Sequence, residues 1–155
     1  MKRKNKLLVI FLVCSLTVFI GFFIVNRKKK AEYITHREKG EALLQQARSG
    51  VAFYFPLVRE AEAEFKKALE MKEDDSDTHT DLGIVAGIYG HYEIAEKEFL
   101  RALEINFKNT FAWNNLAKAY WDQGKKDEAK DAWRRSLEID SNQSKIRQLL
   151  QKAEG

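Results

Sequence analysis

Apolar residues along this chain follow two patterns. Residues 7–25 read LLVIFLVCSLTVFIGFFIV, a stretch without a single charged side chain. From residue 33 onward, apolar positions recur every three or four residues with polar positions between them, which is the spacing of amphipathic helices. This second pattern predicts helices over residues 33–48, 56–72, 77–89, 92–105, 110–123, 126–139 and 144–153. We therefore expect an all-α protein.

The amphipathic part repeats itself with a period of 34 residues. Residues 76–109 align on residues 110–143, and the coinciding positions are not only apolar: Leu82 with Leu116, Gly90 with Gly124, Ala95 with Ala129, Phe99 with Trp133, Leu103 with Leu137, and Glu104 with Glu138. This pattern resembles the tetratricopeptide repeat (TPR) family, whose unit is a helix–turn–helix of this length. The resemblance implies an α-solenoid of about three helix pairs, closed by a capping helix in residues 144–155.

A less regular first repeat is expected in residues 33–75. Its Ala61, Phe65 and Ala68 stand one period before equivalent small and apolar residues of the next repeat. Residues 49–55 (SGVAFYF) lengthen the turn between its two helices. The aromatic residues 53–55 either contact a partner or the membrane surface, or fold back over the open end of the helix stack, since aromatic side chains are generally buried.

Local signals mark where several helices begin and end. Gly90 and Gly124 follow the first helices of the two regular repeats, where a left-handed backbone is easily adopted only by glycine. The acidic run 73–77 lacks the glycine and the distal glutamate of a calcium loop. We expect this run to cap the helix that begins near Asp77. Residues 144–153 carry apolar side chains on one face only, as a capping helix requires.

The uncharged stretch is long enough to cross a bilayer. At about 1.5 Å per residue it spans roughly 28 Å, close to the ~30 Å of the hydrocarbon core. It is longer than the apolar region of a signal peptide, and no small-residue cleavage site precedes residue 26. The chain is therefore predicted to retain a transmembrane helix (7–25) between a basic leader (1–6) and a basic juxtamembrane linker (26–32).

The orientation of this anchor is only weakly encoded. Four Lys/Arg residues precede the helix and four follow it in residues 27–30, so the positive-inside rule discriminates little. A short basic leader before a long domain favours the amino terminus inside. We expect a single-pass protein of the bacterial inner membrane with an extracytoplasmic domain. Residues 27–30 either bind anionic lipids or only fix the depth of the helix.

Charge and cysteine content exclude some classes of protein. The net charge of +4 comes from residues 1–30, which hold eight Lys/Arg and no acidic residue, leaving 19 basic against 23 acidic residues elsewhere. A mildly acidic domain does not suit a nucleic acid partner. The only cysteine, Cys14, lies in the apolar stretch, so no intramolecular disulfide can form and the redox compartment stays open.

No constellation of catalytic or metal-binding residues stands out. The chain has no Gly-rich phosphate loop, no zinc-like spacing of Cys and His, and no nucleophile–base motif. His79 replaces the tryptophan that is usual there in the family, and we interpret it as a packing residue because no second metal ligand accompanies it. We expect neither an enzyme, nor a cofactor, nor a metal.

The resemblance instead implies a binding surface. In the TPR family, the first helices of successive repeats line a concave groove that receives a peptide or helix of a partner. Carried over to this chain, the protein-binding groove consists of ten residues: Thr80, Asp81, Ile84, Ile88, Phe111, Asn114, Asn115, Lys118, Trp121 and Asp122. The two asparagines would bond a peptide backbone, and Lys118 would meet a carboxylate. Trp121 would either anchor the partner or pack under the capping helix.

One type of ligand is disfavoured. The family's carboxylate clamp, which grips a chain-terminal acid, needs basic and asparagine residues in the groove. Thr80, Ile84 and Leu149 stand where some of these should be, and only Asn115 and Lys145 fit. A receptor for chaperone tails is therefore disfavoured.

These features together predict a membrane-anchored TPR adaptor or scaffold. The anchor would hold the groove, with its protein or peptide partner, close to the bilayer and so help to assemble a membrane or envelope complex. The alternative is a self-assembling structural protein, a homo-oligomer in which the groove of one copy accepts residues 27–30 or 49–55 of another.

Overall fold

The structure, a computed structural model, describes the backbone of residues 2–49 and 55–154 and the side chains of residues 18–49 and 55–154. In this part of the chain it contains seven helices: α1 (Lys2–Arg48), α2 (Phe55–Met71), α3 (Ser76–Ile88), α4 (Tyr92–Ile105), α5 (Thr110–Asp122), α6 (Lys126–Ile139) and α7 (Ser144–Glu154). Each of the six helices from α2 onward lies within one residue of its predicted bounds. The all-α prediction is confirmed.

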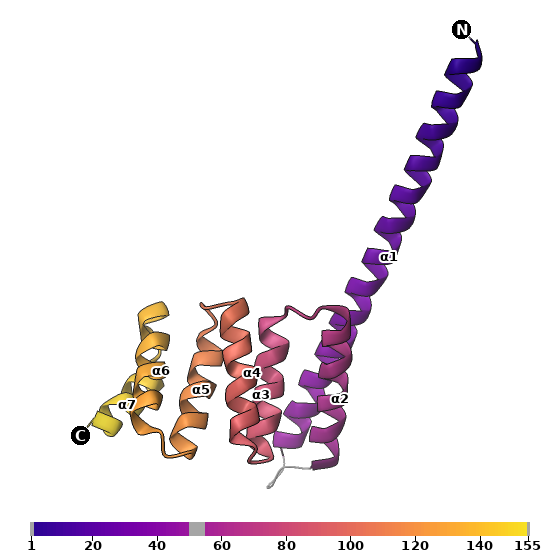
Figure 1. Ribbon diagram of the computed structural model, residues 1–155. Coiled ribbons are helices and arrows are strands. Elements are labelled where there is room, and N and C mark those ends of the chain that lie inside the picture. Colours follow the sequence, from indigo (N-terminus) through magenta and orange to yellow (C-terminus); the bar gives the residue numbers. More distant parts are fainter. Residues whose placement is uncertain (1, 50–54, 155) are drawn as a thin grey trace.

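Helix α1 is a single element of 47 residues that projects far beyond the other helices (Figure 1). Only its carboxy-terminal part packs against α2. Residues 26–32, predicted as a linker, continue the helix without a break. The first repeat therefore shares one continuous helix with the amino-terminal segment.

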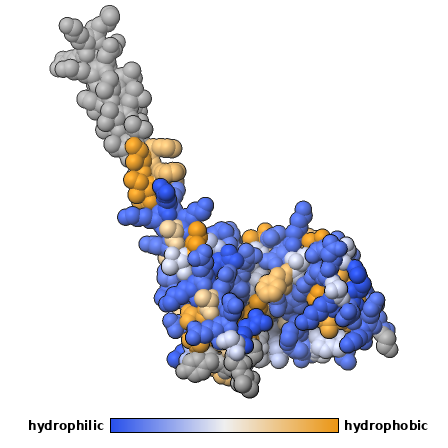
Figure 2. Space-filling view, turned by 180° about the vertical axis from the view of Figure 1, so that it is seen from behind, coloured by the Kyte–Doolittle hydropathy of each residue, from blue (hydrophilic) through white to orange (hydrophobic). Residues whose placement is uncertain are grey.

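The projecting part of α1 leaves its apolar side chains uncovered. Val18, Phe19, Phe22 and Phe23 are each more than 60% exposed, and Figure 2 shows this apolar stretch next to the hydrophilic residues that follow it. Within the part of the chain whose side chains are described, no helix combines the length and the apolar character needed to cross a bilayer. Residues 7–17 of the predicted span lie outside that part, and the transmembrane helix remains a prediction.

The carboxy-terminal part of α1 and the other helices form a row of antiparallel pairs (Figure 1). The pairs are α1 with α2, α3 with α4, and α5 with α6, and α7 lies at the far end. Each pair is closed by one aromatic ring of its second helix. A Cβ atom on Gly40 would lie 2.5 Å from Phe65 Cε1, and a Cβ atom on Gly83 would lie 2.5 Å from Phe99 Cε1. These rings can approach the first helix so closely only because the facing residue is a glycine.

The same geometry shows how the first repeat departs from the period. Phe65 and Phe99 are 34 residues apart, whereas the glycines that they contact, Gly40 and Gly83, are 43 apart. The first repeat therefore has nine extra residues between its contacting positions, Gly40 and Phe65. Some of them lengthen α1 and α2, and residues 50–54, which include most of the aromatic loop, lie outside the described residues. Phe55 opens α2 and stacks on Tyr89, with the ring centroids 5.7 Å apart.

The predicted turn and cap signals are confirmed. Gly90 and Gly124 have φ angles of 76° and 80°, in the left-handed region. Asp75 is the N-cap of α3, and its carboxylate accepts a hydrogen bond of 3.0 Å from the Thr78 N–H. Asn109 caps α5 in the same way through the Ala112 N–H. The acidic run thus begins a helix, as expected.

Helix α7 covers the last repeat with one face. Ile146 and Leu150 pack against the buried cluster that contains Ala117 and Trp133. An ion pair of 2.7 Å between Arg134 and Glu154 ties the end of α7 to α6. Since no residue of α7 is itself buried, this helix has the wet outer face that a terminal cap needs.

Candidate functional site

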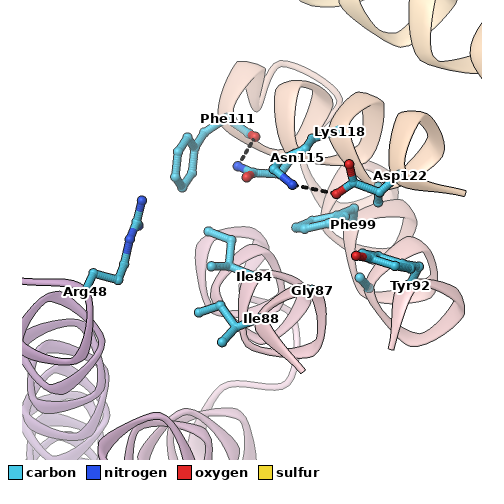
Figure 3. A pocket seen from close by; sticks show the side chains of 13 residues that line it. Arg48, Ile84, Gly87, Ile88, Tyr92, Phe99, Phe111, Asn115, Lys118 and Asp122 are labelled. Carbon is cyan, nitrogen blue, oxygen red and sulfur yellow. Dashed lines mark hydrogen bonds and ion pairs between the residues drawn. The ribbon is translucent and has the colours of Figure 1, made fainter. Parts of the chain in front are cut away.

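A cavity of about 330 Å³ opens on the side of the stack formed by the first helices (Figure 3). Its walls come from the end of α1, from α3 and from α5, and its floor comes from α4. The lining residues with side chains larger than that of alanine are Arg48, Ile84, Ile88, Tyr92, Phe99, Phe111, Asn115, Lys118 and Asp122. The volume lies at the lower end of the range for binding pockets in proteins.

Helical spacing brings the lining residues of each wall together. Ile84 and Ile88 are four residues apart on α3, and Lys118 and Asp122 are four apart on α5, so each pair shares one helix face. The α3 wall is therefore apolar. The α5 wall is polar apart from Phe111, whose side chain is 55% exposed although it is large and apolar. An exposed aromatic ring beside two isoleucines is a surface that a partner can bury.

The polar residues of the α5 wall are held in place by bonds within α5. The Asn115 amide donates a hydrogen bond of 2.8 Å to the Phe111 carbonyl oxygen, and Lys118 Nζ lies 2.5 Å from Asp122 Oδ2, as Figure 3 shows. Lys118 remains 71% exposed despite this ion pair. Its charge is therefore accessible to a ligand, and an exposed pair of this kind costs little to rearrange.

Negative charge gathers on the same face one turn before Ile84. Arg37 of α1 lies 2.9 Å from Glu41 and 3.3 Å from Asp77. Asp81 stands beside this group, and burial, reinforced by the negative charge of Glu41, raises the pKa of its carboxyl group to about 7. Asp81 forms no hydrogen bond or ion pair with any other residue whose side chain is described.

Six of the ten predicted groove residues line the cavity, and Asp81 stands three residues before Ile84 on α3. The six are Ile84, Ile88, Phe111, Asn115, Lys118 and Asp122. The prediction of these six residues rested on the groove positions that the family resemblance implies. Whether this surface binds a protein remains a prediction.

Thr80 and Asn114 do not line the cavity. Thr80 is 1% exposed, and its hydroxyl donates to the Ser76 carbonyl oxygen at 2.8 Å. The Asn114 amide donates to Gln143 Oε1 at 2.6 Å. Both side chains are therefore committed to bonds inside the stack, and the predicted contact of Asn114 with a peptide backbone would first require its bond to Gln143 to break.

These bonds belong to a recurring junction between successive repeats. Asp75, Asn109 and Gln143 follow one another at intervals of 34 residues. The Asn109 amide donates to Ser76 Oγ at 2.9 Å and to Thr80 Oγ1 at 3.3 Å. One repeat later the direction is reversed, and Gln143 Oε1 accepts from the Asn114 amide. A polar residue recurring just before each first helix was the sequence signal for this junction.

Trp121 also lies outside the cavity. Its ring centroid is 5.6 Å from that of Trp133, and Lys126 Nζ lies 5.3 Å from its ring. It thus packs against α6 of its own repeat, and the apolar residues of α7 join the buried cluster around Trp133 instead. Packing of Trp121 under the capping helix is not among these contacts, and its role as an anchor for a partner remains a prediction.

Some lining residues were not predicted. Arg48 faces the cavity from the last turn of α1, in the repeat whose extra residues hide the alignment. Tyr92 and Phe99 belong to α4, a second helix, which the family resemblance does not place in the groove. Their aromatic side chains reach the floor of the cavity because Gly83 and Gly87 of α3, which also line it, have no side chains to cover them.

A second cavity, of about 570 Å³, opens between α2 and α4. Buried Leu82 and Val85 form its floor, and charged residues of both signs form its rim. The carboxylate of one rim residue, Glu98, is already paired with His79, with Oε2 and Nδ1 2.8 Å apart. This cavity gathers no exposed aromatic ring comparable to Phe111, and the cavity on the first helices is the better candidate site.

Two of the three histidines, His36 and His79, are paired with carboxylates. His79 is 12% exposed, with its Nδ1 atom 2.8 Å from Glu98 Oε2 and its Nε2 atom 3.1 Å from the Glu73 carbonyl oxygen. His36 makes the equivalent contact to Glu64. Among residues 18–49 and 55–154, no group of three or more His, Cys, Asp or Glu is arranged to hold a metal ion.

The comparisons with known proteins agree with the architecture. The family model of the tetratricopeptide repeat matches residues 110–143. The first TPR domain of human RPAP3 superposes with a TM-score of 0.69 at 20% identity, covering 79% of this chain and 89% of that one. The second TPR domain of human RPAP3, in complex with the HSP70 peptide SGPTIEEVD, gives 0.69 at 15% identity, covering 82% and 98%.

A third solved structure, the first TPR of Spaghetti (RPAP3) bound to the HSP90 peptide SRMEEVD, gives a TM-score of 0.61 at 21% identity, covering 76% of this chain and 92% of that one. Curated protein sequences yield no match. At these identities the structural likeness establishes the fold alone. Residues 110–143 match the tetratricopeptide repeat model, and the chain has the fold of the TPR domains to which it is similar.

Proposed function

We propose that this protein is an adaptor that binds a segment of a partner protein in the cavity between α1, α3 and α5. The observation that carries this proposal is the open apolar surface of Ile84, Ile88 and Phe111, which is bordered by accessible polar groups. Burying such a surface is the main source of affinity in peptide recognition. TPR domains of similar structure hold peptides, which supports the same role here.

The adaptor is anchored in a membrane through residues 7–25. The exposed apolar side chains of residues 18–25 and the exposed basic residues 27–30 support this part of the proposal. Since α1 is helical to Arg48, residues 26–48 extend roughly 35 Å, so the groove stays near the bilayer. Such tethering raises the effective concentration of a partner in the same membrane and helps to assemble a complex there. The bacterial inner membrane, with the domain outside, is the setting we propose.

Site-specific photo-cross-linking in intact membranes tests the groove. A photoreactive residue at Ile88 should capture a partner protein, whereas one at Leu100, which is 40% exposed on α4, should not. Because Phe111 is more than half exposed, Phe111→Ala removes groove surface without opening the core, and it should reduce the capture at Ile88 several-fold. Equal capture at both positions, or capture that ignores Phe111→Ala, would exclude this groove.

Extraction and protease protection test the anchor. The full chain should stay in the membrane pellet at alkaline pH, and a version that starts at residue 31 should be released. A carboxy-terminal tag should be digested by protease added to spheroplasts if the domain lies outside. Release of the full chain would contradict the anchor, and protection of the tag in spheroplasts would place the domain on the other side.

A self-assembling protein is the second candidate. The specific observation in its favour is that residues 27–30 are basic and exposed, while Asp81, Asp77 and Glu41 make one end of the groove acidic. The cross-linking experiment separates the two functions. Capture of a second copy of this chain at Ile88, in place of another protein, would favour self-assembly.

A further inference from the structure

The groove has one end that is rich in unbalanced negative charge. Glu41 and Asp77 contact a single guanidinium group, that of Arg37, and the charges of these three groups act on the nearby carboxyl group of Asp81. The guanidinium is shared between Glu41 at 2.9 Å and Asp77 at 3.3 Å. Two carboxylates therefore share one cation, and the carboxyl group of Asp81 forms no ion pair with the residues whose side chains are described.

Asp81 is the group that a ligand would satisfy best. It is partly buried, and the charged groups that act on it are Glu41 and Arg37 from α1 and Asp75 and Asp77 from its own repeat. Burial and the surrounding carboxylates disfavour its charged form and raise its pKa to about 7. A cation placed beside Asp81 would stabilise the carboxylate and replace the water that it has lost.

The acidic end is continuous with the apolar part of the groove. Asp81, Ile84 and Ile88 stand three and four residues apart on α3, so they form one stripe along the helix. The stripe is about 10 Å long, at 1.5 Å per residue. Two neighbouring turns of a bound helix, or three to four residues of an extended peptide, reach from one end to the other.

We propose that the groove is specific for a cationic and apolar segment of a partner protein. A Lys or Arg side chain of this segment lies at Asp81, Glu41 and Asp77, and a large apolar side chain lies against Ile84, Ile88 and Phe111. The proposal rests on the proposed function of the groove and adds the chemistry of its ligand. The peptides in the similar structures, SRMEEVD and SGPTIEEVD, end in acidic residues and would bring further carboxylates to Asp81.

The internal repeat supplies a matched pair of variants. Asp81 and Asn115 are 34 residues apart and occupy the same position of successive repeats. Asp81→Asn removes one charge from the acidic end and installs the residue that the next repeat already carries there. Asn115→Asp adds one charge to the opposite wall. Glu104→Gln, on the exposed surface of α4, removes an equal charge outside the groove.

The experiment selects ligands from a random library of twelve-residue peptides, using the full chain in lipid nanodiscs. Selected peptides should be enriched in Lys and Arg next to a large apolar residue, and synthetic copies should bind the Asp81→Asn variant about tenfold more weakly, the effect of one charge-assisted contact. Asn115→Asp should bind them at least as well as the parent chain, and Glu104→Gln should bind them equally. Phe111→Ala should weaken every peptide, whatever its charge.

The outcomes separate the two levels of the proposal. Selection of acidic or neutral peptides that still depend on Phe111 would overturn the inferred charge preference and leave the groove as a binding site. Selection of no peptide, or binding that ignores Phe111→Ala, would overturn both. A peptide copy of residues 24–34 serves as competitor. If it binds more tightly than the selected peptides and is equally sensitive to Asp81→Asn, the occupant is a second copy of this chain, which would contradict a separate partner protein.

Discussion

The first two repeats and the third close the same helix–helix contact with different chemistry. In repeats one and two, His36 lies 2.5 Å from Glu64 and His79 lies 2.8 Å from Glu98. In repeat three, the position of the histidine is taken by Trp113. Its indole N–H donates to the Phe107 carbonyl oxygen at 2.9 Å, and its ring packs against the buried clusters on both sides.

The repeats are therefore vulnerable to different changes. An aromatic contact depends on buried area and is insensitive to pH. A buried ionic contact depends on keeping every partner, because removing one leaves the other desolvated and unpaired. Glu64 is the extreme case, since it is 4% exposed and is contacted by His36, Lys39 and Lys67.

The largest loss of stability is expected from a substitution in the apolar contact of the third repeat. Trp133→Ala removes the ring that closes the third helix pair and supports Trp113 and α7. It should lower the free energy of unfolding by about 3–5 kcal/mol, which is a large part of the total for a domain of this size. Chemical denaturation followed by circular dichroism measures it. A loss below about 1 kcal/mol would show that the third repeat does not depend on this ring.

Glu64→Gln breaks the ionic side. The substitution keeps the shape but leaves three cationic or protonatable partners without a carboxylate, and it should cost about 2–3 kcal/mol. Glu98→Gln is the matched control. It should cost less than about 1 kcal/mol, since Glu98 is 30% exposed and has one histidine partner. Equal costs in denaturant titrations would contradict the role of burial.

The same carboxylate predicts a dependence on acid. Hydrogen bonds from His36, Lys39 and Lys67 lower the pKa of Glu64 to about 2. The unfolded chain therefore binds more protons than the folded one between about pH 4.5 and pH 2. The stability that Glu64 contributes is complete above that window and is lost as the pH falls through it. Glu64→Gln should flatten the acid limb of stability against pH, and an unchanged limb would contradict this assignment.

In the groove, Asp81 affects the pH dependence of stability in the direction opposite to Glu64, and the next repeat has the uncharged Asn115 at the same position. The pKa of Asp81 is raised to about 7, above its unfolded value near 4. The folded chain therefore holds a proton that the unfolded chain releases, and stability falls as the pH rises from about 4 to 7. Asp81→Asn should gain roughly 1–2 kcal/mol at pH 8 and nothing at pH 4. A gain that is independent of pH would assign the effect to helix propensity instead.

The smallest expected effect concerns the glycines beneath the aromatic rings. Gly83→Ala places a methyl group against the Phe99 ring and should cost about 1 kcal/mol, because the clash exceeds the gain in helix propensity. The reciprocal variant, Ala117→Gly, probes the equivalent position of the third repeat and should also destabilise, by loss of propensity and packing. Thermal unfolding measures the loss of stability of each variant. An increase in stability on Gly83→Ala would contradict the close approach of the Phe99 ring to Gly83.

Local signals predicted local structure well. Gly90 and Asp75 act through their own backbone and the next few residues, so one sequence was sufficient to place a turn and a cap. The helix bounds followed from apolar spacing for the same reason. The groove was predicted in part because Ile84, Ile88, Lys118 and Asp122 lie on helix faces that the period defines.

The errors came from contacts between distant parts of the chain. Thr80 and Asn114 occupy groove-facing positions in the repeat, but residues about 29 positions further along, Asn109 and Gln143, hold them inside the stack. Arg48 was not predicted because the nine extra residues of the first repeat place it outside the 34-residue alignment of the repeats. Neither effect is visible in apolar spacing, which reports burial and not the partner of a polar group.

The central claim is that the first helices, and not the second ones, form the binding surface. Hydrogen–deuterium exchange of the full chain in nanodiscs, with and without a selected peptide, tests it most directly. We expect slower amide exchange on binding in the carboxy-terminal part of α1 and in α3 and α5, with α6 unchanged. Protection confined to α2, α4 and α6 would contradict it.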